Sequence, residues 1–425
     1  MTSNPLLTME AIETRDSDSL LQATVHLEEA ARLLDVEDWI VERLRRPERE
    51  VTVNLPLSRG RGPAASCTGL RVQHNSTRGP CMGEVRLSPE VQLHQVRARA
   101  AEATWQAALL DLPLGGSAGA LVCNPQEMPE RELRQLIKDY VYALREFIGP
   151  FSDVLTTDGS NEYTAAWMLD SYARTLGRTE AGVVTGKAEV LGGITWRQQA
   201  PGLGIVRLLE EALAGRREML ARKRVAIQGL GNVGASALKA LHQAGAQIVA
   251  VADVSGGVLA QDGIDVAALQ QHLRRERVVF GFPEAEAVSN SDVLQSACDV
   301  LVAAVPRHQI NSPIAQRVQA AIVVEAAEEA VTPEAEKILL ARDVLVAPAM
   351  LGTAGVAIAS FAEWTQAVRG AWMDEHEAVQ MLRSRLAWAY QAAATTADKL
   401  KCSLRAASYV VAIERVAAAL RLRAY

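Results

Sequence analysis

The chain has 425 residues, of which 49% are hydrophobic and 22% charged, and its formal net charge is −6 at pH 7. Such a composition predicts a soluble globular protein with two or three domains, and its negative charge gives no overall field that would attract nucleic acid or anionic lipid. No apolar run approaches the roughly 20 residues that span a bilayer, and the acidic start differs from a signal peptide. We therefore expect a cytoplasmic protein that binds neither nucleic acid nor membranes.

The cysteines and histidines give no sign of a disulfide framework or a metal centre. Five cysteines are scattered without a C-x-x-C pair, and the seven histidines lack the spacing of metal ligands. We expect neither a disulfide nor a bound metal.

The first part of the chain alternates helical and extended patterns. Apolar residues at helical spacing predict a solvated N-terminal helix layer over residues 20–46, which stops at Pro47. Further patterns predict three short strands and two helices, over residues 51–57, 69–74, 84–87, 91–110 and 129–148. The glycines Gly115, Gly116 and Gly119 punctuate the chain between these two helices.

The second part shows a strand–helix alternation that predicts a parallel sheet with helices on both faces. A segment rich in Gly, Thr and Pro over residues 182–204 is the candidate hinge, and a helix follows over 205–213. The strands are expected at residues 225–228, 247–253, 278–280, 300–302, 321–324 and 344–347, with a helix at 233–244. The tail from Ser360 to Leu422 is expected to be helical and to pack back on the first domain.

A glycine-rich motif follows the first of these strands directly. It runs Gly229-Leu230-Gly231-Asn232-Val233-Gly234 and opens a helix, and Asp253 lies 19 residues beyond it at the end of the next strand. In such a motif Gly229 makes the tight turn, Gly231 lets the backbone approach a pyrophosphate and Gly234 permits close helix packing. Asp253 would hydrogen-bond an adenosine ribose, which favours NAD over NADP. A turn that folds and binds nothing is the alternative.

Several ordered blocks of sequence carry a family resemblance. They are Gly69 to Asn75, Arg78-Gly79-Pro80, Asp111-Leu112-Pro113, Gly115-Gly116, Thr185-Gly186-Lys187, Gly192-Gly193, Gln228 to Gly234, Pro333-Glu334-Ala335, Ala412 to Val416 and Leu420 to Arg423. From about residue 45 to the C-terminus the chain resembles the glutamate/leucine/phenylalanine/valine dehydrogenase family. The resemblance implies an α/β fold: an N-terminal substrate and oligomerisation domain over 1–185, completed by 360–425, and a Rossmann NAD-binding domain over 186–359.

The resemblance also implies a reaction, the reversible oxidative deamination of an L-amino acid by hydride transfer to a nicotinamide. Such a site needs cations for the substrate and a lysine beside the reacting carbon. The two substrate lysines of the family correspond to Met82 and Gln106 here, and the catalytic lysine corresponds to Ala118. Only seven of the 44 basic residues are lysine, but a drift from lysine to arginine would have left arginine at these positions.

Other site positions are retained. The resemblance places Asp158 at the family's proton-shuttling aspartate and Ser360 at the serine that contacts the substrate side chain. Asp158 without its lysine could instead cap a loop. Arg78 and Arg86 could hold one substrate carboxylate, and salt bridges within the domain are the alternative for both.

The nicotinamide end departs from the family pattern as well. Glu328 stands where an asparagine usually meets the cofactor, and Pro201 replaces the threonine that would bond the nicotinamide amide. The residues that differ from the family pattern therefore lie at the expected reacting centre, whereas the residues expected to bind the adenosine half of the cofactor are kept.

Three hypotheses follow. In the first, the chain is a catalytically inactive regulatory subunit that assembles with an active glutamate dehydrogenase paralogue, in a hexamer as is usual in the family, and responds to an amino-acid effector such as leucine or glutamate. In the second, it is an active NAD-dependent amino-acid dehydrogenase with an altered substrate. In the third, it is a sensor of an adenine nucleotide or an amino acid without a catalytic partner.

Overall fold

The structure, a computed structural model, describes residues 23–57, 65–157 and 162–424. Contacts divide the chain into two compact units. Unit 1 comprises Met1–Thr195, Ser360–Asp374 and Tyr409–Tyr425, and unit 2 comprises Trp196–Ala359 and Glu375–Ser408. The chain therefore passes between the units four times.

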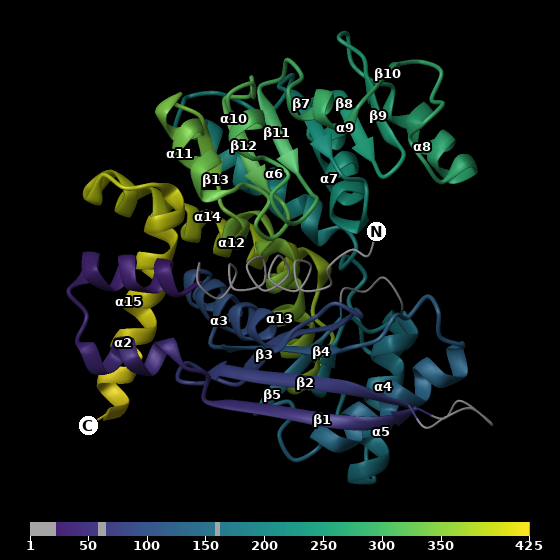
Figure 1. The fold of residues 1–425 in the computed structure, drawn as a ribbon, viewed down its shortest axis with the longest axis vertical. Coiled ribbons are helices and arrows are strands. Elements are labelled where there is room, and N and C mark those ends of the chain that lie inside the picture. Colours follow the sequence, from purple (N-terminus) through teal and green to yellow (C-terminus); the bar gives the residue numbers. More distant parts are fainter. Residues whose placement is uncertain (1–22, 58–64, 158–161, 425) are drawn as a thin grey trace, which may run out of the picture. The chain divides into compact units, whose positions relative to one another are not determined.

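Unit 1 is built on a six-stranded sheet in the order β1-β2-β4-β3-β5-β6 (Figure 1). Its strands are β1 (Arg49–Leu57), β2 (Ala65–Asn75), β3 (Cys81–Leu87), β4 (Gly115–Leu121), β5 (Asp153–Thr156) and β6 (Val184–Thr185). β1, β2 and β4 pair antiparallel, whereas β3 pairs parallel with both β4 and β5. Its early helices are residues 23–34, α2 (Asp38–Arg45), α3 (Leu93–Leu109), α4 (Glu130–Leu144) and α5 (Glu162–Leu176).

The two faces of this sheet have different partners because successive side chains of a strand point to opposite faces. On one face, Ala118 and Ala120 of β4 join Leu70 and Val72 of β2 in a cluster with α3 residues such as Ala100. On the other face, a larger cluster joins β2 and β4 to α4 and α5, including Cys67, Leu121, Ile137, Tyr140 and Met168. We call these the α3 face and the α4 face.

Unit 2 has a seven-stranded sheet in the order β10-β9-β8-β7-β11-β12-β13. The strands are β7 (Arg224–Gln228), β8 (Gln247–Asp253), β9 (Gly256–Leu259), β10 (Glu286–Val288), β11 (Val300–Ala303), β12 (Ile322–Glu325) and β13 (Leu345–Ala347). β8, β7, β11, β12 and β13 run parallel, and β9 and β10 add antiparallel pairs at one edge. The predicted Rossmann-like parallel sheet is confirmed.

The other elements of unit 2 are helices (Figure 1). They are α6 (Ala200–Ala214), α7 (Asn232–Gln243), α8 (Val266–Glu276), α9 (Asn290–Leu294), α10 (Ser312–Ala315), α11 (Pro333–Ala341), α12 (Ala349–Gly352) and α14 (Glu375–Leu400). Of these, α6 packs on both α7 and α14. Two further helices, α13 (Ala354–Arg369) and α15 (Leu404–Ala424), each continue from unit 2 into unit 1 without a break.

The division by contacts differs from the expected domains in the C-terminal tail. The tail is helical as predicted, but residues 375–408 contact unit 2, not unit 1. In α14, Arg383 donates to Glu210 of α6 at 2.9 Å and Gln391 donates to Glu211 at 2.8 Å. Only Ser360–Asp374 and Tyr409–Tyr425 belong with unit 1.

Three element predictions need correction. The helix expected over residues 20–46 breaks at Asp35, whose φ is +51°. The strand expected at 278–280 is wrong, because the amides of Val279 and Phe280 donate to Asp253 and Ser255 side chains instead of to a neighbouring strand. The glycine-rich stretch treated as a break contains the inner strand β4.

Among the described residues, no helix combines the length and the apolar character needed to cross a membrane.

Candidate functional site

The three positions that lack lysine lie on or over the α3 face of the unit 1 sheet. Met82 on β3 pairs with Gly116 of β4, two residues before Ala118. Both side chains are buried, with exposed fractions of 8% and 3%. Gln106 is in the last turn of α3, the helix that packs on this face. The fold therefore brings these distant parts of the sequence into one region.

The surroundings of Ala118 are apolar. Its methyl group belongs to the cluster formed with Leu70, Val72, Val96 and Ala100. Such an environment offers no partner to a charge and disfavours an unpaired ionised group.

The two arginines proposed for the substrate face acidic side chains. Arg78, in the loop after β2, donates to Oδ1 of Asp111 at 2.8 Å. Arg86 on β3 lies 3.5 Å from Glu84 of the same strand. These contacts agree with salt bridges within the unit, the alternative raised for both residues.

A buried cation that sequence reasoning missed lies on the α4 face. Arg71 donates to both carboxylate oxygens of Asp153, at 2.8 and 2.5 Å, to Oγ of Ser117 at 2.7 Å and to the carbonyl oxygen of Gly83 at 3.1 Å. Burial opposes its charge, but the Asp153 carboxylate outweighs this and raises the pKa of Arg71. Because Arg71 alternates with Leu70 and Val72 along β2, the sheet separates its guanidinium from Ala118. No sequence signal linked Arg71 to Asp153.

The other two substrate-side positions are placed differently. Asp158 lies outside the described residues; the strand that leads to it, β5, ends at Thr156. Ser360 is in α13 and is buried, with 3% of its surface exposed.

The glycine-rich motif forms the turn between β7 and α7 at the centre of the unit 2 sheet, where β7 is flanked by β8 and β11. Gly229 has a φ of +94°, which favours glycine. A Cβ on Gly234 would overlap the carbonyl oxygen of Gly229. At Gly231, by contrast, a Cβ would meet no described atom within 4 Å beyond its chain neighbours. Gly231 and Asn232 are exposed at the N-terminus of α7, with Val233 next to them.

This geometry fits the pyrophosphate of a dinucleotide. The fold itself requires a glycine at positions 229 and 234. It does not require one at position 231, where the open space would let a phosphate group approach the backbone closely. The first amides of α7 and the positive end of its dipole face that space.

Asp253 is already engaged by its own loop. It ends β8, where Oδ1 accepts from the amide and hydroxyl of Ser255 at 2.7 and 2.5 Å, and Oδ2 accepts from the amide of Val279 at 2.8 Å. A carboxylate has about four lone-pair sites, so one remains for a ribose hydroxyl. The three internal bonds fix the orientation of the carboxylate and give Asp253 a structural role besides the predicted one.

The two nicotinamide-side positions lie on different elements. Pro201 is buried in the first turn of α6. Glu328 follows β12, where its carbonyl oxygen accepts from the amide of Arg307 at 3.0 Å. Arg307, His308 and Glu329 in these loops have positive φ values of 63°, 56° and 53°, which are costly for residues with side chains.

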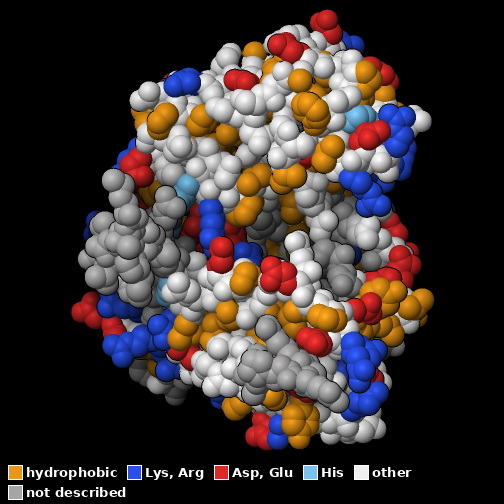
Figure 2. Space-filling model, turned by 45° about the vertical axis from the view of Figure 1, so that its right-hand side comes forward, with side chains coloured by type: hydrophobic (Ala, Val, Ile, Leu, Met, Phe, Trp, Pro, Cys, Tyr) orange, Lys and Arg blue, Asp and Glu red, His pale blue; other side chains and the backbone are white. Residues whose placement is uncertain are grey.

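The molecular surface carries charges of both signs. Figure 2 shows basic and acidic side chains distributed over the visible face, with hydrophobic ones between them. This distribution agrees with the modest net charge of −6.

Known proteins match nearly the whole chain. The family model described as Glutamate/Leucine/Phenylalanine/Valine dehydrogenase matches residues 192–424, and that described as Glu/Leu/Phe/Val dehydrogenase, dimerisation domain, matches residues 47–174. The catabolic NAD-specific glutamate dehydrogenase RocG of Bacillus subtilis is 35% identical over 403 residues, 94% of either chain. Glutamate dehydrogenase A2 of Halobacterium salinarum is 36% identical over 410 residues, 96% of this chain and 99% of that one. A hetero-hexameric glutamate dehydrogenase from Thermus thermophilus, solved in a Leu-bound form, has a TM-score of 0.88 at 37% identity, over 94% of this chain and 96% of that one.

Proposed function

The chain belongs to the glutamate/leucine/phenylalanine/valine dehydrogenase family, and we propose that within it the chain is a regulatory subunit without dehydrogenase activity of its own. In this proposal it assembles with an intact, catalytic glutamate dehydrogenase subunit into an NAD-dependent hetero-oligomer, for which a hexamer is the favoured form. The assembly responds to an amino-acid effector such as leucine or glutamate.

One observation carries the proposal: the reacting centre expected from the family has no lysine. Met82, Gln106 and Ala118 supply a thioether, an amide and a methyl group. Losing a charged hydrogen-bond partner costs roughly 1.5–3 kcal/mol, and losing a positioned acid or base slows a reaction about 10²–10⁴-fold. Arg78 and Arg86 already face carboxylates, so neither is held ready for a substrate.

The adenosine half of the cofactor site supports retained nucleotide binding. The turn from Gly229 to Gly234, with Asp253, would hold the adenosine ribose and the pyrophosphate of NAD. A bound dinucleotide supplies a hydride acceptor in this family. Here, however, Pro201 and Glu328 replace the groups expected to meet the nicotinamide, so this chain's residues bind and orient the nucleotide without completing a reaction.

Two comparisons support assembly with other subunits. Residues 47–174 match a model described as a dimerisation domain, and the Thermus thermophilus relative is described as hetero-hexameric and Leu-bound. A family member that keeps the associating domain while lacking the catalytic lysines is suited to a mixed assembly, because its interfaces do not depend on the reaction.

An active dehydrogenase with an altered substrate is the second candidate. It is favoured by 35% identity to a relative named as NAD-specific glutamate dehydrogenase over 94% of the chain. This candidate requires a replacement cation beside the reacting carbon.

Co-expression with an intact homologue tests the proposal. We expect the two chains to purify together, and we expect the glutamate oxidation rate of the mixed complex to change with added leucine or glutamate more strongly than that of the intact homologue alone. The chain alone should show no oxidation of glutamate, leucine, phenylalanine or valine with NAD or NADP.

Turnover by the chain alone at the roughly 1–10³ s⁻¹ typical of enzymes would contradict the proposal and favour the active dehydrogenase. Failure to form a mixed complex would contradict the regulatory role.

A further inference from the structure

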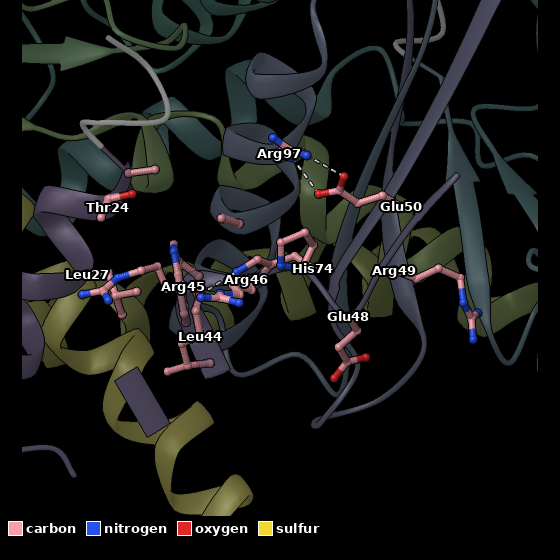
Figure 3. Close-up of a pocket in the computed structure, with 14 residues that line it drawn as sticks. Thr24, Leu27, Leu44, Arg45, Arg46, Glu48, Arg49, Glu50, His74 and Arg97 are labelled. Carbon is pink, nitrogen blue, oxygen red and sulfur yellow. Dashed lines mark hydrogen bonds and ion pairs between the residues drawn. The ribbon is translucent and has the colours of Figure 1, made fainter. Parts of the chain in front are cut away.

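A cavity of about 430 Å³ adjoins α3 in unit 1, and Trp105 of that helix belongs to its lining. Figure 3 shows Arg97 and Glu50 directed at each other in this cavity, and two hydrogen bonds of 2.6 and 2.7 Å join them. Each ring nitrogen of His74, in the same lining, lies 2.9 Å from a protein oxygen. These polar side chains are therefore satisfied within the protein, and a reactive pair lies instead on the α4 face.

Two cysteines meet at the end of the ladder between β2 and β4. The two strands pair antiparallel up to the end of β4. One further bond continues the ladder, because the amide of Val122 donates to the carbonyl oxygen of Thr68 at 2.9 Å. The next residues in this register are Cys67 and Cys123. Both belong to the buried cluster of the α4 face.

The thiol groups of this pair are in contact. The Cys67 thiol donates to the carbonyl oxygen of Val122 at 3.4 Å, and that carbonyl is bonded to the nitrogen of Cys123. The Cys123 thiol in turn hydrogen-bonds the sulfur of Cys67. Residues opposite each other in antiparallel strands lie about 4.5–5.5 Å apart at Cα, and a disulfide spans roughly 4.4–6.8 Å. The two sulfurs can therefore bond without a large movement of either strand.

The pair lies just below the surface of unit 1. Only 2% of Cys67 and 8% of Cys123 are exposed, but Ser66 is exposed beside one of them, and none of residues 124–130 after the other is buried. The chain leaves the sheet at Cys123, whose amide donates to the carbonyl oxygen of Leu121 at 2.9 Å. A local opening of this connection between β4 and α4, of the kind that folded proteins undergo, admits a small oxidant such as hydrogen peroxide.

Electrostatics distinguishes the two sulfurs. The hydrogen bond from the Cys123 thiol lowers the pKa of the Cys67 thiol, although burial opposes it, whereas the same contact raises the pKa of Cys123. Because the thiolate is the reactive form of cysteine, Cys67 is the attacking sulfur. Cys81 provides a comparison within the same unit. Its thiol donates to the carbonyl oxygen of Asn75 at 3.7 Å, not to another thiol, and burial raises its pKa.

We propose that Cys67 and Cys123 form a redox site, at which a peroxide converts the two thiols into a disulfide and a dithiol restores them. The Cys67 sulfur attacks one peroxide oxygen, the O–O bond breaks and water leaves, which gives a sulfenic acid. The Cys123 sulfur then attacks the Cys67 sulfur, the S–O bond breaks and a second water leaves. The two sulfurs thereby lose two electrons, their thiol hydrogens end in water, and one hydrogen peroxide is reduced to two water molecules. This inference does not depend on the proposed regulatory function.

The disulfide closes a loop that contains β3, α3 and β4, and with them the three positions that lack lysine. Closing a loop of this length removes conformational freedom from the unfolded chain. The oxidised unit is therefore more stable than the reduced one, and the start of the connection from β4 to α4 is fixed to β2.

Peptide mapping of the full chain tests the pair. The remaining thiols are blocked with N-ethylmaleimide before digestion, and mass spectrometry identifies the cysteines that are joined. We expect a cross-link between Cys67 and Cys123 of one chain after hydrogen peroxide, and its removal by dithiothreitol through thiol–disulfide exchange. Cys81→Ser is the matched control, because it removes another buried thiol of unit 1; it should form the same cross-link.

Single variants test the order of attack. In Cys123→Ser, where the serine hydroxyl can still donate to Cys67, peroxide should leave a sulfenic acid at Cys67 that dimedone traps. In Cys67→Ser, Cys123 should give roughly tenfold less adduct, because burial still raises the pKa of its thiol. An equal or larger adduct at Cys123 would overturn the assignment of Cys67 as the attacking sulfur.

Melting curves test the effect of the disulfide on the fold. The oxidised wild type should melt about 5–10 °C above the reduced protein. The variant with both cysteines replaced by serine should melt at the same temperature after either treatment. An unchanged melting temperature in the cross-linked wild type would overturn the tethering of β4 to β2.

The site itself would be overturned by the absence of a cross-link in the wild type, by a cross-link that joins other cysteines, or by one that joins two copies of the chain. A cross-link that forms only in urea would overturn it as well, because the folded unit would then keep the oxidant out. The wild-type map needs no substitution, so a serine variant that fails to fold leaves this test intact.

Discussion

Ala118 stands where a lysine ammonium group would have to share a cluster with Leu70 and Val72. We predict that Ala118→Lys alone restores no glutamate oxidation, because Met82 and Gln106 still supply no cation and functions of a cooperating set are not additive. The substitution should also destabilise the protein by roughly 1–3 kcal/mol through overpacking. Initial rates with glutamate and NAD, together with urea unfolding, measure both effects.

Ala118→Met is the control for that experiment, because methionine is similarly long but uncharged. Comparable destabilisation in the two variants would assign the effect to size, not to charge. Any turnover from the lysine variant that the methionine variant lacks would show that substrate binding has survived.

His74 gives the protein a defined sensitivity to acid. Burial lowers the pKa of His74 from its ordinary value of 6.5 to about 4, so below pH 6.5 the unfolded chain binds a proton that the folded chain does not. Stability is therefore lost as the pH falls from 6.5 towards 4, and this residue should account for about 2 kcal/mol between pH 7.5 and pH 5. The wild type should lose that much more than His74→Gln in urea unfolding at the two pH values, and equal losses would contradict the prediction.

At the scale of single elements, two glycines of the turn between β7 and α7 should have different roles: Gly234 is needed for folding, and Gly231 for binding a nucleotide. Gly234→Ala should destabilise unit 2 by about 3 kcal/mol, because its Cβ would overlap the carbonyl oxygen of Gly229. Gly231→Ala should change stability by less than about 1 kcal/mol, because its φ of −66° suits alanine and its Cβ meets open space. The same change should weaken ADP binding at least tenfold, since the methyl group occupies the space left for the pyrophosphate. Thermal unfolding and calorimetry distinguish the two, and undiminished ADP binding by Gly231→Ala would mean that the turn does not hold a nucleotide.

A second prediction for this turn concerns the two halves of the cofactor. ADP should bind about as tightly as NAD if the proposed site is right, because the residues expected to hold the adenosine half are kept, whereas Pro201 and Glu328 stand where the family's nicotinamide contacts are expected. Calorimetric titration of the chain with each ligand measures the ratio. A large preference for NAD would indicate an intact nicotinamide pocket and move the interpretation towards an active dehydrogenase.

The elements show which features local sequence can predict. Strands β7 and β8 are runs of buried Val, Ile and Ala followed by a turn signal, so their place in a parallel sheet was predictable and is confirmed. β4 was not, because three of its seven residues are glycine and its strand pairing depends on β2 and β3, which are distant in sequence. Val279 shows the reverse case. Its β-branched side chain favours a strand, but its amide donates to the Asp253 carboxylate instead of to a neighbouring strand.

The site shows the same division. The glycine turn was predictable from the spacing of its glycines, because all the residues that form it lie in one short segment of the chain. The Arg71–Asp153 pair and the cavity beside Trp105 join segments far apart in the chain, and no local pattern records which distant side chains meet. Whether the predicted substrate and cofactor residues act as proposed stays a prediction for the experiments above.

At the scale of the whole molecule, the two units are interleaved in sequence. α14 carries buried leucines at 382 and 386 within unit 2, and burying a leucine contributes about 1.5–3 kcal/mol. A fragment of residues 196–359 should therefore melt roughly 10 °C below one that adds residues 375–408 through a flexible linker. Circular dichroism melts of both fragments test this; equal melting temperatures would show that unit 2 does not need α14.

The unit 1 sheet keeps its buried ion pair on the α4 face and the replaced lysine positions on the α3 face. If lysines once stood at these positions, as the proposed function implies, their loss would leave the Arg71–Asp153 network intact, since that network lies on the other face of the sheet. The reverse path is harder, because a single regained lysine gives no activity on which selection could act until the others return. On the proposed function, catalysis would thus be lost in small steps that folding does not oppose, with no equally gradual way back.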